Sequence, residues 1–305
     1  MKVLVTGGAG FIGSHIVDQL IAAEHQVTVV DDLSAGSLSH VNKQAEFVEL
    51  SILDEKLLKL FERQQFDAVL HLAAQTIVAS SLQHPDVDAR MNVLGTLKVL
   101  EGCRHTRVDR IVFASSAAVY GNVSVLPVAE DADRQPTSFY GLSKLTAERY
   151  IQMYHDLYGL HYFILRYANV YGERQGDRGE GGVVSIFARG MSEGVPLTIY
   201  GDGEQTRDFV FVDDVAAANI AALTSSNTEL ILNISTRTET SVNRMSALLK
   251  EISGYQGHIE YGPARSGDIL RSMLSNSQAC ASLDWMPRIS LQEGLARTYC
   301  SLQND

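Results

Sequence analysis

The sequence has 305 residues, a formal net charge of −11 at pH 7 and an isoelectric point near 5.3, which argues against nucleic acid and anionic membrane as partners. Its three cysteines (Cys103, Cys280 and Cys300) are scattered, and its nine histidines form no H-x-x-x-H or H-E-x-x-H pair. Glycines interrupt the apolar N-terminus before a signal-peptide core could form. We therefore expect a cytoplasmic protein without a metal site.

The first predicted elements are a strand, a glycine-rich turn and a helix. A β-branched run over 2–6 leads into Gly7, Gly10 and Gly13, and apolar residues follow at helical spacing over 11–24. Gly7 permits the tight turn, Gly10 lets the backbone approach a pyrophosphate, and Gly13 lets the helix pack closely on the strand. The N-terminus of the helix offers unpaired N–H groups to phosphates. This context predicts a dinucleotide-binding site.

A second strand is predicted over 26–31, and it ends at Asp31, 18 residues beyond Gly13. A carboxylate at this position accepts hydrogen bonds from both ribose hydroxyls and repels a 2′-phosphate. Asp32 follows, and no arginine stands nearby to bind that phosphate. The sequence therefore predicts NAD, rather than NADP, as the cofactor.

Strand-like and helical segments then alternate as far as residue 166. This alternation predicts right-handed crossovers and an α/β fold built on a doubly wound, parallel (Rossmann-type) sheet. Further strands are expected over 46–49, 68–72, 110–115 and 162–166, and the helices between them over 54–63, 87–106 and 140–158.

The regular alternation of strand-like and helical segments ends near residue 170. We expect an NAD-binding Rossmann domain over 1–170 and, over 171–305, mainly a smaller mixed substrate lobe, with part of 205–235 returning to the first domain. The stretch 172–182 holds five glycines among charges, which indicates a mobile loop. Helix starts are predicted at Asp213, at Ser241 and at the capping box Ser290-Leu-Gln-Glu293.

Three residues have the types and spacing of a catalytic group. Tyr140 and Lys144 are one helical turn apart, so their side chains share one helix face, and Ser116 stands upstream in Ser-Ser-Ala-Ala-Val-Tyr-Gly. An ammonium beside a phenol favours the phenolate, which can then act as a base near neutral pH. We predict that Ser116, Tyr140 and Lys144 are catalytic.

Taken together, these motifs resemble the extended short-chain dehydrogenase/reductases, of the NAD-dependent epimerase/dehydratase family, and most closely the nucleotide-sugar 4-epimerases. The resemblance covers nearly all of the chain. Besides the glycine turn and the catalytic group, it rests on His71-Leu-Ala-Ala-Gln75, Asn92 in Met-Asn-Val-Leu-Gly-Thr, Arg166-Tyr-Ala-Asn169, Gly201-Asp-Gly-Glu-Gln-Thr-Arg207 and Arg265-Ser-Gly-Asp268.

The resemblance implies which residues bind NAD and which bind a UDP-sugar. One departure is that Ser51 stands where the family often has an aspartate for the adenine, so we expect a weaker adenine contact. The implied cofactor residues are Gly7, Gly10, Phe11, Ile12, Gly13, Asp31, Ser51, Ile52, Leu72, Ala73, Ala74, Gln75, Asn92, Tyr140, Lys144 and Tyr167. The implied substrate residues are Ser116, Tyr140, Asn169, Val183, Arg207, Arg265, Asp268 and Ser272.

The implied reaction is inversion at C4 of a UDP-hexose. Tyr140 would remove the 4-hydroxyl proton, directly or through Ser116, while the C4 hydride passes to NAD and returns to the opposite face of a transient 4-keto sugar. UDP-glucose and UDP-galactose are the expected pair. The N-acetylhexosamine pair is expected as well, because Ser272 stands where a bulky tyrosine would crowd the C2 substituent. The resemblance also implies a homodimer formed through helices 87–106 and 140–158.

Other functions remain open at this level. A dehydratase of this fold needs an acid/base pair after the catalytic hydroxyl, where this chain has Ala117 and Ala118. Arg174 and Arg178 keep a UDP-glucuronate 4-epimerase or decarboxylase possible, since they could bind a substrate carboxylate. A non-enzymatic NAD-bound sensor or scaffold would be favoured only if Ser116, Tyr140 or Lys144 had been lost.

Overall fold

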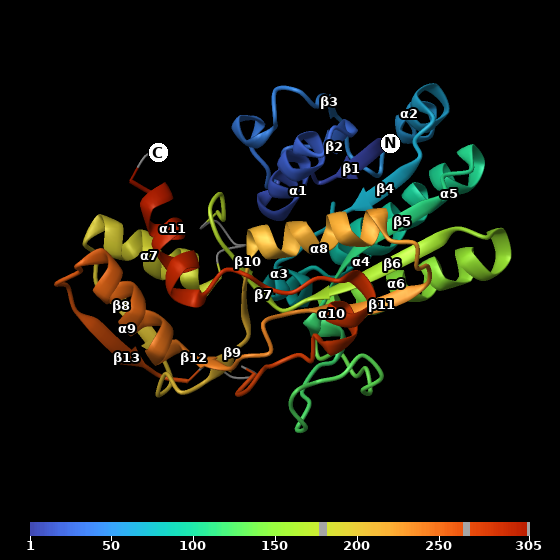
Figure 1. Ribbon diagram of the computed structural model, residues 1–305. Helices are drawn as coiled ribbons and strands as arrows, with labels where there is room; N and C mark the ends of the chain where they lie inside the picture. The colour runs from blue at the N-terminus through green and yellow to red at the C-terminus, as the bar shows by residue number, and fades with distance from the viewer. Residues whose placement is uncertain (177–181, 265–268, 304–305) are drawn as a thin grey trace.

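A computed structural model of the chain describes residues 1–176, 182–264 and 269–303. The described residues form a seven-stranded sheet with helices on both faces, and a smaller lobe of helices and short strands lies beside it (Figure 1). The predicted α/β fold is therefore confirmed. None of the described helices has both the length and the apolar character needed to cross a bilayer.

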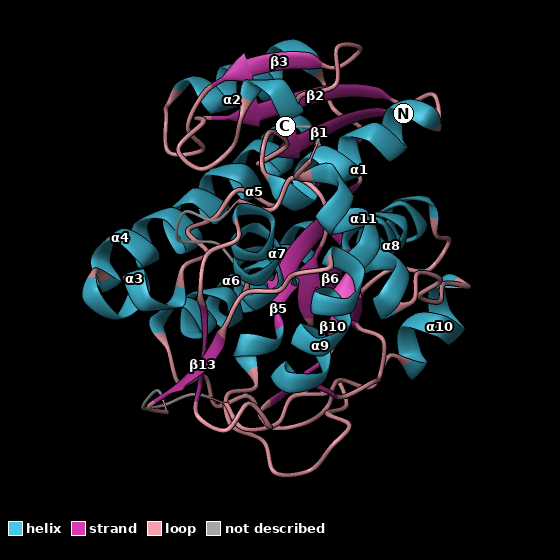
Figure 2. Ribbon diagram, turned by 90° about the vertical axis from the view of Figure 1, so that its left-hand side faces the viewer, coloured by secondary structure: helices cyan, strands magenta, loops and turns pink. Residues whose placement is uncertain are grey.

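Every neighbouring pair in this sheet is parallel, in the order β11-β6-β5-β4-β1-β2-β3. Figure 2 shows β1, β2 and β3 side by side at one edge of the molecule. The strand order reverses direction at β1 and β4, as in a doubly wound fold, and the opposite edge strand, β11, comes from beyond residue 170. The strands are β1 (Lys2–Thr6), β2 (Gln26–Asp31), β3 (Glu46–Glu49), β4 (Ala68–His71), β5 (Arg110–Ser116), β6 (His161–Tyr167) and β11 (Leu230–Ile234).

Two apolar cores cover the two faces of the sheet. In β1, Val3 and Val5 pack into one core and Leu4 into the other, because successive side chains of a strand point to opposite faces. This double burial explains why the strands are apolar throughout rather than alternating. One face carries α1 (Phe11–Ala22), α8 (Val212–Thr224) and α10 (Ser277–Leu283), and the other carries α2 (Lys56–Gln64), α5 (Gly95–Thr106) and α6 (Phe139–Tyr158).

The helix predicted over 87–106 is not uniform. It begins as α4 (Pro85–Ala89), passes through a π-helical turn over Arg90–Leu94 and continues as α5. Asn92 lies in that turn, where its side-chain amide bonds the backbone N–H and C=O of Gln75. A one-residue bulge of this kind re-aims a side chain, and apolar spacing does not reveal it.

Among its described residues the smaller lobe has the helices α7 (Val183–Glu193), α9 (Val242–Ser253) and α11 (Leu291–Ser301), which lie together at the left of Figure 1. Short helices over Leu38–His40, Val78–Gln83 (α3) and Ala117–Val119 complete the connections of the larger unit. Short two-stranded sheets join β7 (Asn169–Tyr171) to β10 (Phe209–Phe211), β9 (Thr206–Arg207) to β12 (Thr240–Ser241), and β8 (Leu197–Tyr200) to β13 (Ile259–Gly262).

Two of the three predicted helix starts are confirmed. The hydroxyls of Ser241 and Ser290 accept hydrogen bonds from the N–H groups of Arg244 and Glu293. The third is wrong, because α8 begins at Val212 and Asp213 lies inside its first turn. Asp213 binds side chains of other elements instead of capping its own. Of the glycine-rich stretch, residues 177–181 lie outside the described residues.

Candidate active site

A cavity of about 390 Å³ opens at the carboxyl end of the sheet. Its walls include residues at the ends of five strands: Gly7 after β1, Asp31 on β2, Leu72 after β4, Ser116 on β5 and Tyr167 on β6. Ligands of open α/β sheets bind at this edge. A cavity of this size suits a small organic ligand or part of a larger one.

The glycine turn can be built only from glycines at two of its positions. Gly7 has a φ of +72°, and a Cβ there would lie 2.7 Å from the backbone nitrogen of Ala73. At Gly13 a Cβ would lie 2.1 Å from the carbonyl oxygen of Gly7. The missing side chains let α1 begin directly against β1, with its N-terminal N–H groups at the cavity.

Asp31 connects the end of β2 to this turn. Its Oδ2 accepts a hydrogen bond from the N–H of Ala9 (3.0 Å) and its Oδ1 one from the N–H of Leu33 (2.9 Å). Burial raises the pKa of Asp31, and these two hydrogen bonds oppose that rise. A carboxylate has about four acceptor sites, so Asp31 keeps capacity for ribose hydroxyls.

A buried chain of hydrogen bonds supports the cavity wall after β4. The hydroxyl of Thr96 donates to the carbonyl of Asn92 (2.6 Å), so it accepts from Nε2–H of His71 (3.0 Å). Nδ1 of His71 then accepts from the hydroxyl of Thr6 (2.7 Å), whose oxygen receives the N–H groups of the next two residues after the strand, Leu72 and Ala73. Burial, with a smaller contribution from Lys144, lowers the pKa of His71 to about 3. The imidazole is therefore neutral and fixed in one tautomer.

Lys144 is 3% exposed and points from α6 into the cavity wall. Its Nζ donates to the carbonyl of Ala114 (2.9 Å) and lies 5.9 Å from the centroid of the Tyr140 ring. Burial lowers the pKa of Lys144 to about 8, and the carboxylates of Asp88 and Glu148 oppose that change. The geometry places an ammonium beside the phenol, which is the arrangement that the spacing of these two residues predicted.

Ser116 is the last residue of β5 and lines the same cavity. Its hydroxyl oxygen accepts the N–H of Ala118 (3.2 Å) and so caps the short helix over Ala117–Val119. This bond uses an acceptor site and leaves the hydroxyl proton for a donor role. Ser116 therefore both ends the strand and faces the cavity with Tyr140.

A buried ion pair braces the strand ends beneath these residues. Arg166, on β6, is 0% exposed and makes a bidentate pair with Glu148 on α6 (2.7 and 2.9 Å). Glu148 also accepts the hydroxyl of Ser115 (2.5 Å), and Arg166 donates to the hydroxyl of Tyr120 (2.8 Å). Because these bonds join α6 to β5 and β6, they fix Tyr140 and Lys144 relative to Ser116.

The predicted cofactor residues fall into two groups. Ser51, Gln75 and Asn92 do not line the cavity that the described residues form: Ser51 accepts the N–H of Leu53, and the amides of Gln75 and Asn92 bond Asp88. The rest line it, namely Gly7, Gly10, Phe11, Ile12, Gly13, Asp31, Ile52, Leu72, Ala73, Ala74, Tyr140, Lys144 and Tyr167. Bare glycine backbone, a carboxylate at the ribose position and apolar walls together fit NAD.

Fewer of the predicted substrate residues reach this cavity. Ser116, Tyr140 and Asn169 line it. Three others belong to the smaller lobe and its connections and do not line the cavity that the described residues form, namely Val183, Arg207 and Ser272. The side chain of Arg207 instead donates hydrogen bonds to the carbonyls of Thr206 and Ile269 (2.8 and 2.7 Å). Arg265 and Asp268 lie outside the described residues.

Sequence reasoning missed two stretches of the cavity wall. One follows Asp31 and comprises Asp32, Ser34, Ala35 and Gly36, and the other, Thr76, Ile77 and Val78, follows the motif that ends at Gln75. The first stretch comes directly after the strand predicted over 26–31 and the second begins four residues after the strand predicted over 68–72, and the carboxyl ends of these strands were the available signal. Gln175 and Gly182 also line the cavity; both belong to the glycine-rich stretch 172–182, for which the sequence predicted a loop but no contact with the site.

Comparison with known proteins agrees with this geometry. A model of the NAD dependent epimerase/dehydratase family matches residues 3–235. A protein of Methanocaldococcus jannaschii named putative UDP-glucose 4-epimerase is 47% identical, over 99% of each chain. The structure of UDP-glucose 4-epimerase from Thermotoga maritima with UDP-glucose has a TM-score of 0.97 and 44% identity, and the match covers 100% of this chain and 99% of that one.

A third relative has a different sugar in its name. UDP-N-acetylglucosamine 4-epimerase from Methanobrevibacter ruminantium M1, solved in complex with UDP-N-acetylmuramic acid, has a TM-score of 0.95 and 32% identity; the match covers 99% of this chain and 98% of that one. Family match, identity and site geometry lead to one conclusion. The chain belongs to the NAD dependent epimerase/dehydratase family and is an enzyme whose cofactor is NAD.

Proposed function

We propose that this enzyme inverts C4 of UDP-hexoses, interconverting UDP-glucose with UDP-galactose and also their N-acetylhexosamine counterparts. The observation that carries the proposal is the position of the Lys144 ammonium, 5.9 Å from the Tyr140 ring centroid, in a cavity that also contains Ser116 and the glycine turn. The names of the two 4-epimerases with TM-scores of 0.97 and 0.95 support it.

The roles of the chain's own residues follow from this arrangement. Tyr140, as phenolate, takes the proton of the 4-hydroxyl, and Ser116 orients that hydroxyl or relays its proton. Lys144 stabilises the phenolate with its buried charge, and after inversion Tyr140 returns the proton to O4. Bound NAD would supply the redox chemistry of the reaction, as acceptor and donor of the C4 hydride. Asp31 and the glycine turn hold the cofactor at its adenosine and diphosphate part.

We further propose that residues 1–170 bind NAD and that 171–305 provide most of the substrate site. Asn169, exposed at the cavity, contacts the sugar diphosphate, while Arg207 and Arg265 bind its charges and Asp268 binds the uridine ribose. Val183 lies at the start of α7, next to the cavity residue Gly182. An anchored UDP group leaves the 4-keto sugar free to turn over between the two half-reactions.

The choice of sugar is proposed to depend on the size of residue 272. Ser272 is half-buried, two residues before the buried Leu274, and a serine leaves room for an N-acetyl group at C2. Ser272→Tyr should lower kcat/KM for UDP-N-acetylglucosamine by the cost of a steric clash, about 1–3 kcal/mol, and leave that for UDP-glucose nearly unchanged. Equal loss with both sugars would refute this role of Ser272.

One observation bears on the uronate alternative. Arg174, a candidate partner for a substrate carboxylate, has its Nη1 2.8 Å from Oδ2 of Asp18. That pairing favours an uncharged C6 group, whereas Arg178 lies outside the described residues.

The deciding experiment is incubation of the purified enzyme, without added cofactor, with UDP-glucose, UDP-N-acetylglucosamine or UDP-glucuronate, followed by chromatographic separation of C4 epimers. Conversion of the first two supports the proposal. Conversion of UDP-glucuronate alone, or loss of carbon dioxide from it, would replace the proposal with the uronate function. Tyr140→Phe is the control for a contaminating activity.

We also propose a homodimer formed through α4–α5 and α6. These helices carry exposed apolar side chains that a partner subunit would cover, including Val87, Leu94, Leu142, Met153 and Leu157. Light scattering at micromolar concentration should give twice the chain mass of 33.4 kDa. A species of the single-chain mass alone would contradict the dimer.

A further inference from the structure

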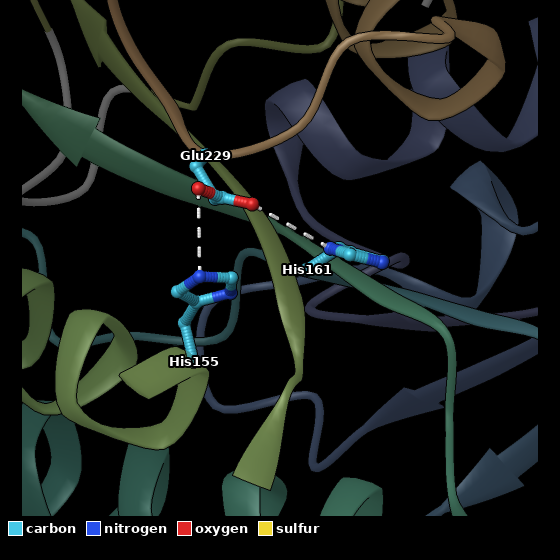
Figure 3. A group of neighbouring side chains, drawn as sticks. All are labelled: His155, His161 and Glu229. Carbon is cyan, nitrogen blue, oxygen red and sulfur yellow. Dashed lines mark ion pairs between the residues drawn. The ribbon is translucent and has the colours of Figure 1, made fainter. Parts of the chain in front are cut away.

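Two histidines and a glutamate meet at the amino end of the sheet, away from the cavity. His155 lies near the end of α6, His161 is the first residue of β6, and Glu229 directly precedes the edge strand β11 (Figure 3). One ligand atom from each lies within 4.8 Å of the others. Since β6 runs from His161 to Tyr167 at the cavity, the cluster lies roughly 20 Å from the catalytic end, at about 3.3 Å per residue.

The ring of His155 is oriented by a carbonyl group. Its Nδ1 lies 3.2 Å from the carbonyl oxygen of Leu160, and because a carbonyl only accepts, Nδ1 carries the proton. Nε2, on the other side of the ring, faces Oε2 of Glu229. A second hydrogen bond that fixes the tautomer in this way is typical of histidines that bind metals.

The facing distances do not suit direct hydrogen bonds. Nε2 of His155 lies 3.4 Å from Oε2 of Glu229, whereas a charge-assisted N–H···O bond is about 2.7–2.9 Å long. Two ligands bound tetrahedrally at about 2.0–2.1 Å from one zinc ion lie about 3.3–3.4 Å apart. The separation thus matches two ligands of a common cation.

His161 faces the other oxygen of the Glu229 carboxylate. Nδ1 of His161 is buried, makes no hydrogen bond to a described residue and lies 3.9 Å from Oε1 of Glu229. Glu229 has a φ of +62°, a conformation that residues with a Cβ rarely adopt, and Oε1 accepts the hydroxyl of Thr228 (3.1 Å). A buried imidazole nitrogen without a hydrogen bond, facing a carboxylate oxygen at a distance too long for one, leaves room for a cation between them.

The second histidine–carboxylate group among the described residues is built differently. His15 lies with Glu173 and Asp213, but both of its ring nitrogens have partners: Asp213 (2.9 Å) and the carbonyl of Glu173 (3.1 Å). Arg297 pairs with both carboxylates. That group is a satisfied ion-pair network with no vacant ligand atom facing its centre.

We propose that His155, His161 and Glu229 bind a divalent transition-metal cation of the zinc class, with water completing the coordination. Two imidazole nitrogens and one carboxylate oxygen suit zinc better than magnesium, which prefers oxygen ligands. The bound ion joins α6 and the start of β6 to the segment before β11. The ion therefore strengthens the attachment of the edge strand β11 to the rest of the sheet, and it leaves the geometry of the catalytic end unchanged. The sequence did not indicate the site, because five residues separate the histidines and the glutamate comes from 68 residues beyond.

The test is zinc binding by the chelator-treated, full-length enzyme. Calorimetric titration with zinc chloride should give one site per chain, and zinc should raise the thermal unfolding midpoint, while magnesium chloride should not. His161→Asn and Glu229→Gln should each weaken zinc binding on the order of 10-fold or more. The matched control is His105→Gln, which alters a histidine–glutamate pair (His105 with Glu101, 3.7 Å) that has no second histidine.

The proposal would be overturned by the absence of a zinc-dependent rise in the unfolding midpoint, or by zinc affinity in both ligand variants equal to that of the wild type. The side chains of His161 and Glu229 are partly exposed, at 37% and 43%, and circular dichroism and retained activity verify that the variants fold. Zinc binding abolished by His105→Gln, but not by His161→Asn, would equally contradict the assignment.

Discussion

The two ends of the seven-stranded sheet differ in how deeply their titratable side chains are buried and in the partners that these side chains have. At the carboxyl end, Asp31, His71 and Lys144 are nearly fully buried, and each has fixed partners. At the amino end the carboxylates are exposed: the side chain of Asp109, which pairs with the adjacent Arg110, is 61% exposed, and that of Glu229, which faces His155, is 43% exposed. Both ends belong to the same strands, so the difference arises in the connections that follow or precede them.

This difference in burial changes the pKa values of the side chains and the strength of their ion pairs. Burial changes the pKa of both buried bases: it lowers that of His71 to about 3, so the imidazole is neutral at pH 7, and that of Lys144 to about 8, so the amine is mostly charged at pH 7 but titrates close to neutrality. An exposed pair is screened by water and adds little to stability. We therefore expect side chains at the carboxyl end of the sheet to take part in catalysis, and those at the amino end only to hold helices and strands together. The following substitutions test this difference between the two ends.

The largest expected effect is on catalysis. Tyr140→Phe keeps the ring and its packing but removes the acid/base group, so kcat should fall roughly 10²- to 10⁴-fold. NAD content and the unfolding midpoint should stay close to wild type. The measurement is C4 epimer formation by chromatography, with Tyr150→Phe, a partly exposed tyrosine on the same helix, as the control. Retained activity would remove Tyr140 from the mechanism.

The buried ion pair beneath the site should give the largest loss of stability. Glu148→Gln leaves Arg166 buried without a compensating charge and should lower the free energy of unfolding by about 3–5 kcal/mol in urea denaturation. The matched variant is Glu101→Gln, which breaks an exposed pair with Arg104 and should cost less than about 1 kcal/mol. Equal losses in the two variants would mean that burial does not determine how much an ion pair contributes to the free energy of unfolding.

Asp31→Ala should weaken NAD binding by roughly 10- to 100-fold, the equivalent of about 1.5–3 kcal/mol for hydrogen bonds to a charged group. It should also reduce the preference for NAD over NADP, since the repulsion of a 2′-phosphate is lost. Equilibrium binding of both dinucleotides to the cofactor-free enzyme measures this. Asp32→Ala, at the neighbouring exposed carboxylate, should have the smaller effect; unchanged NAD affinity in Asp31→Ala would contradict the ribose assignment.

His71 should make the fold sensitive to acid. Its pKa is about 3 in the folded chain and 6.5 ordinarily, so below pH 6.5 the unfolded chain binds a proton that the folded chain does not. Stability should therefore be fully present above pH 6.5 and decrease as pH falls toward 3, by up to about 1.4 kcal/mol per unit. Urea unfolding at several pH values should show a shallower slope for His71→Gln and an unchanged slope for the exposed His84→Gln.

The smallest effect is expected at the amino end. Arg110, the first residue of β5, donates from Nη1 to the carbonyls of Leu223 and Ser225 at the end of α8 (3.0 and 2.7 Å). Arg110→Ala should lower the free energy of unfolding by about 1 kcal/mol, because these helix-end carbonyls then face water instead. Epimerisation kinetics should not change. A loss of activity comparable to that of a catalytic-end variant would contradict the division between the two ends.

Features that depend on local spacing could be predicted from the amino-acid sequence. The glycine turn, Asp31 at a strand end and the turn between Tyr140 and Lys144 are contained in short stretches, and local geometry decides where their side chains lie. The alternation of strands and helices fixed the parallel sheet for a similar reason, since a crossover between parallel strands has one hand.

Features that join segments distant in the sequence became visible only in the tertiary structure. The π-helical turn at Asn92, the chain of hydrogen bonds from Thr6 through His71 to Thr96, and the meeting of His155 and His161 with Glu229 have no local signature. Apolar periodicity reports which face of an element is buried, but not what touches that face. Hydrogen bonds between remote residues depend on packing angles and distances that are set only when the whole sheet and its helices have assembled.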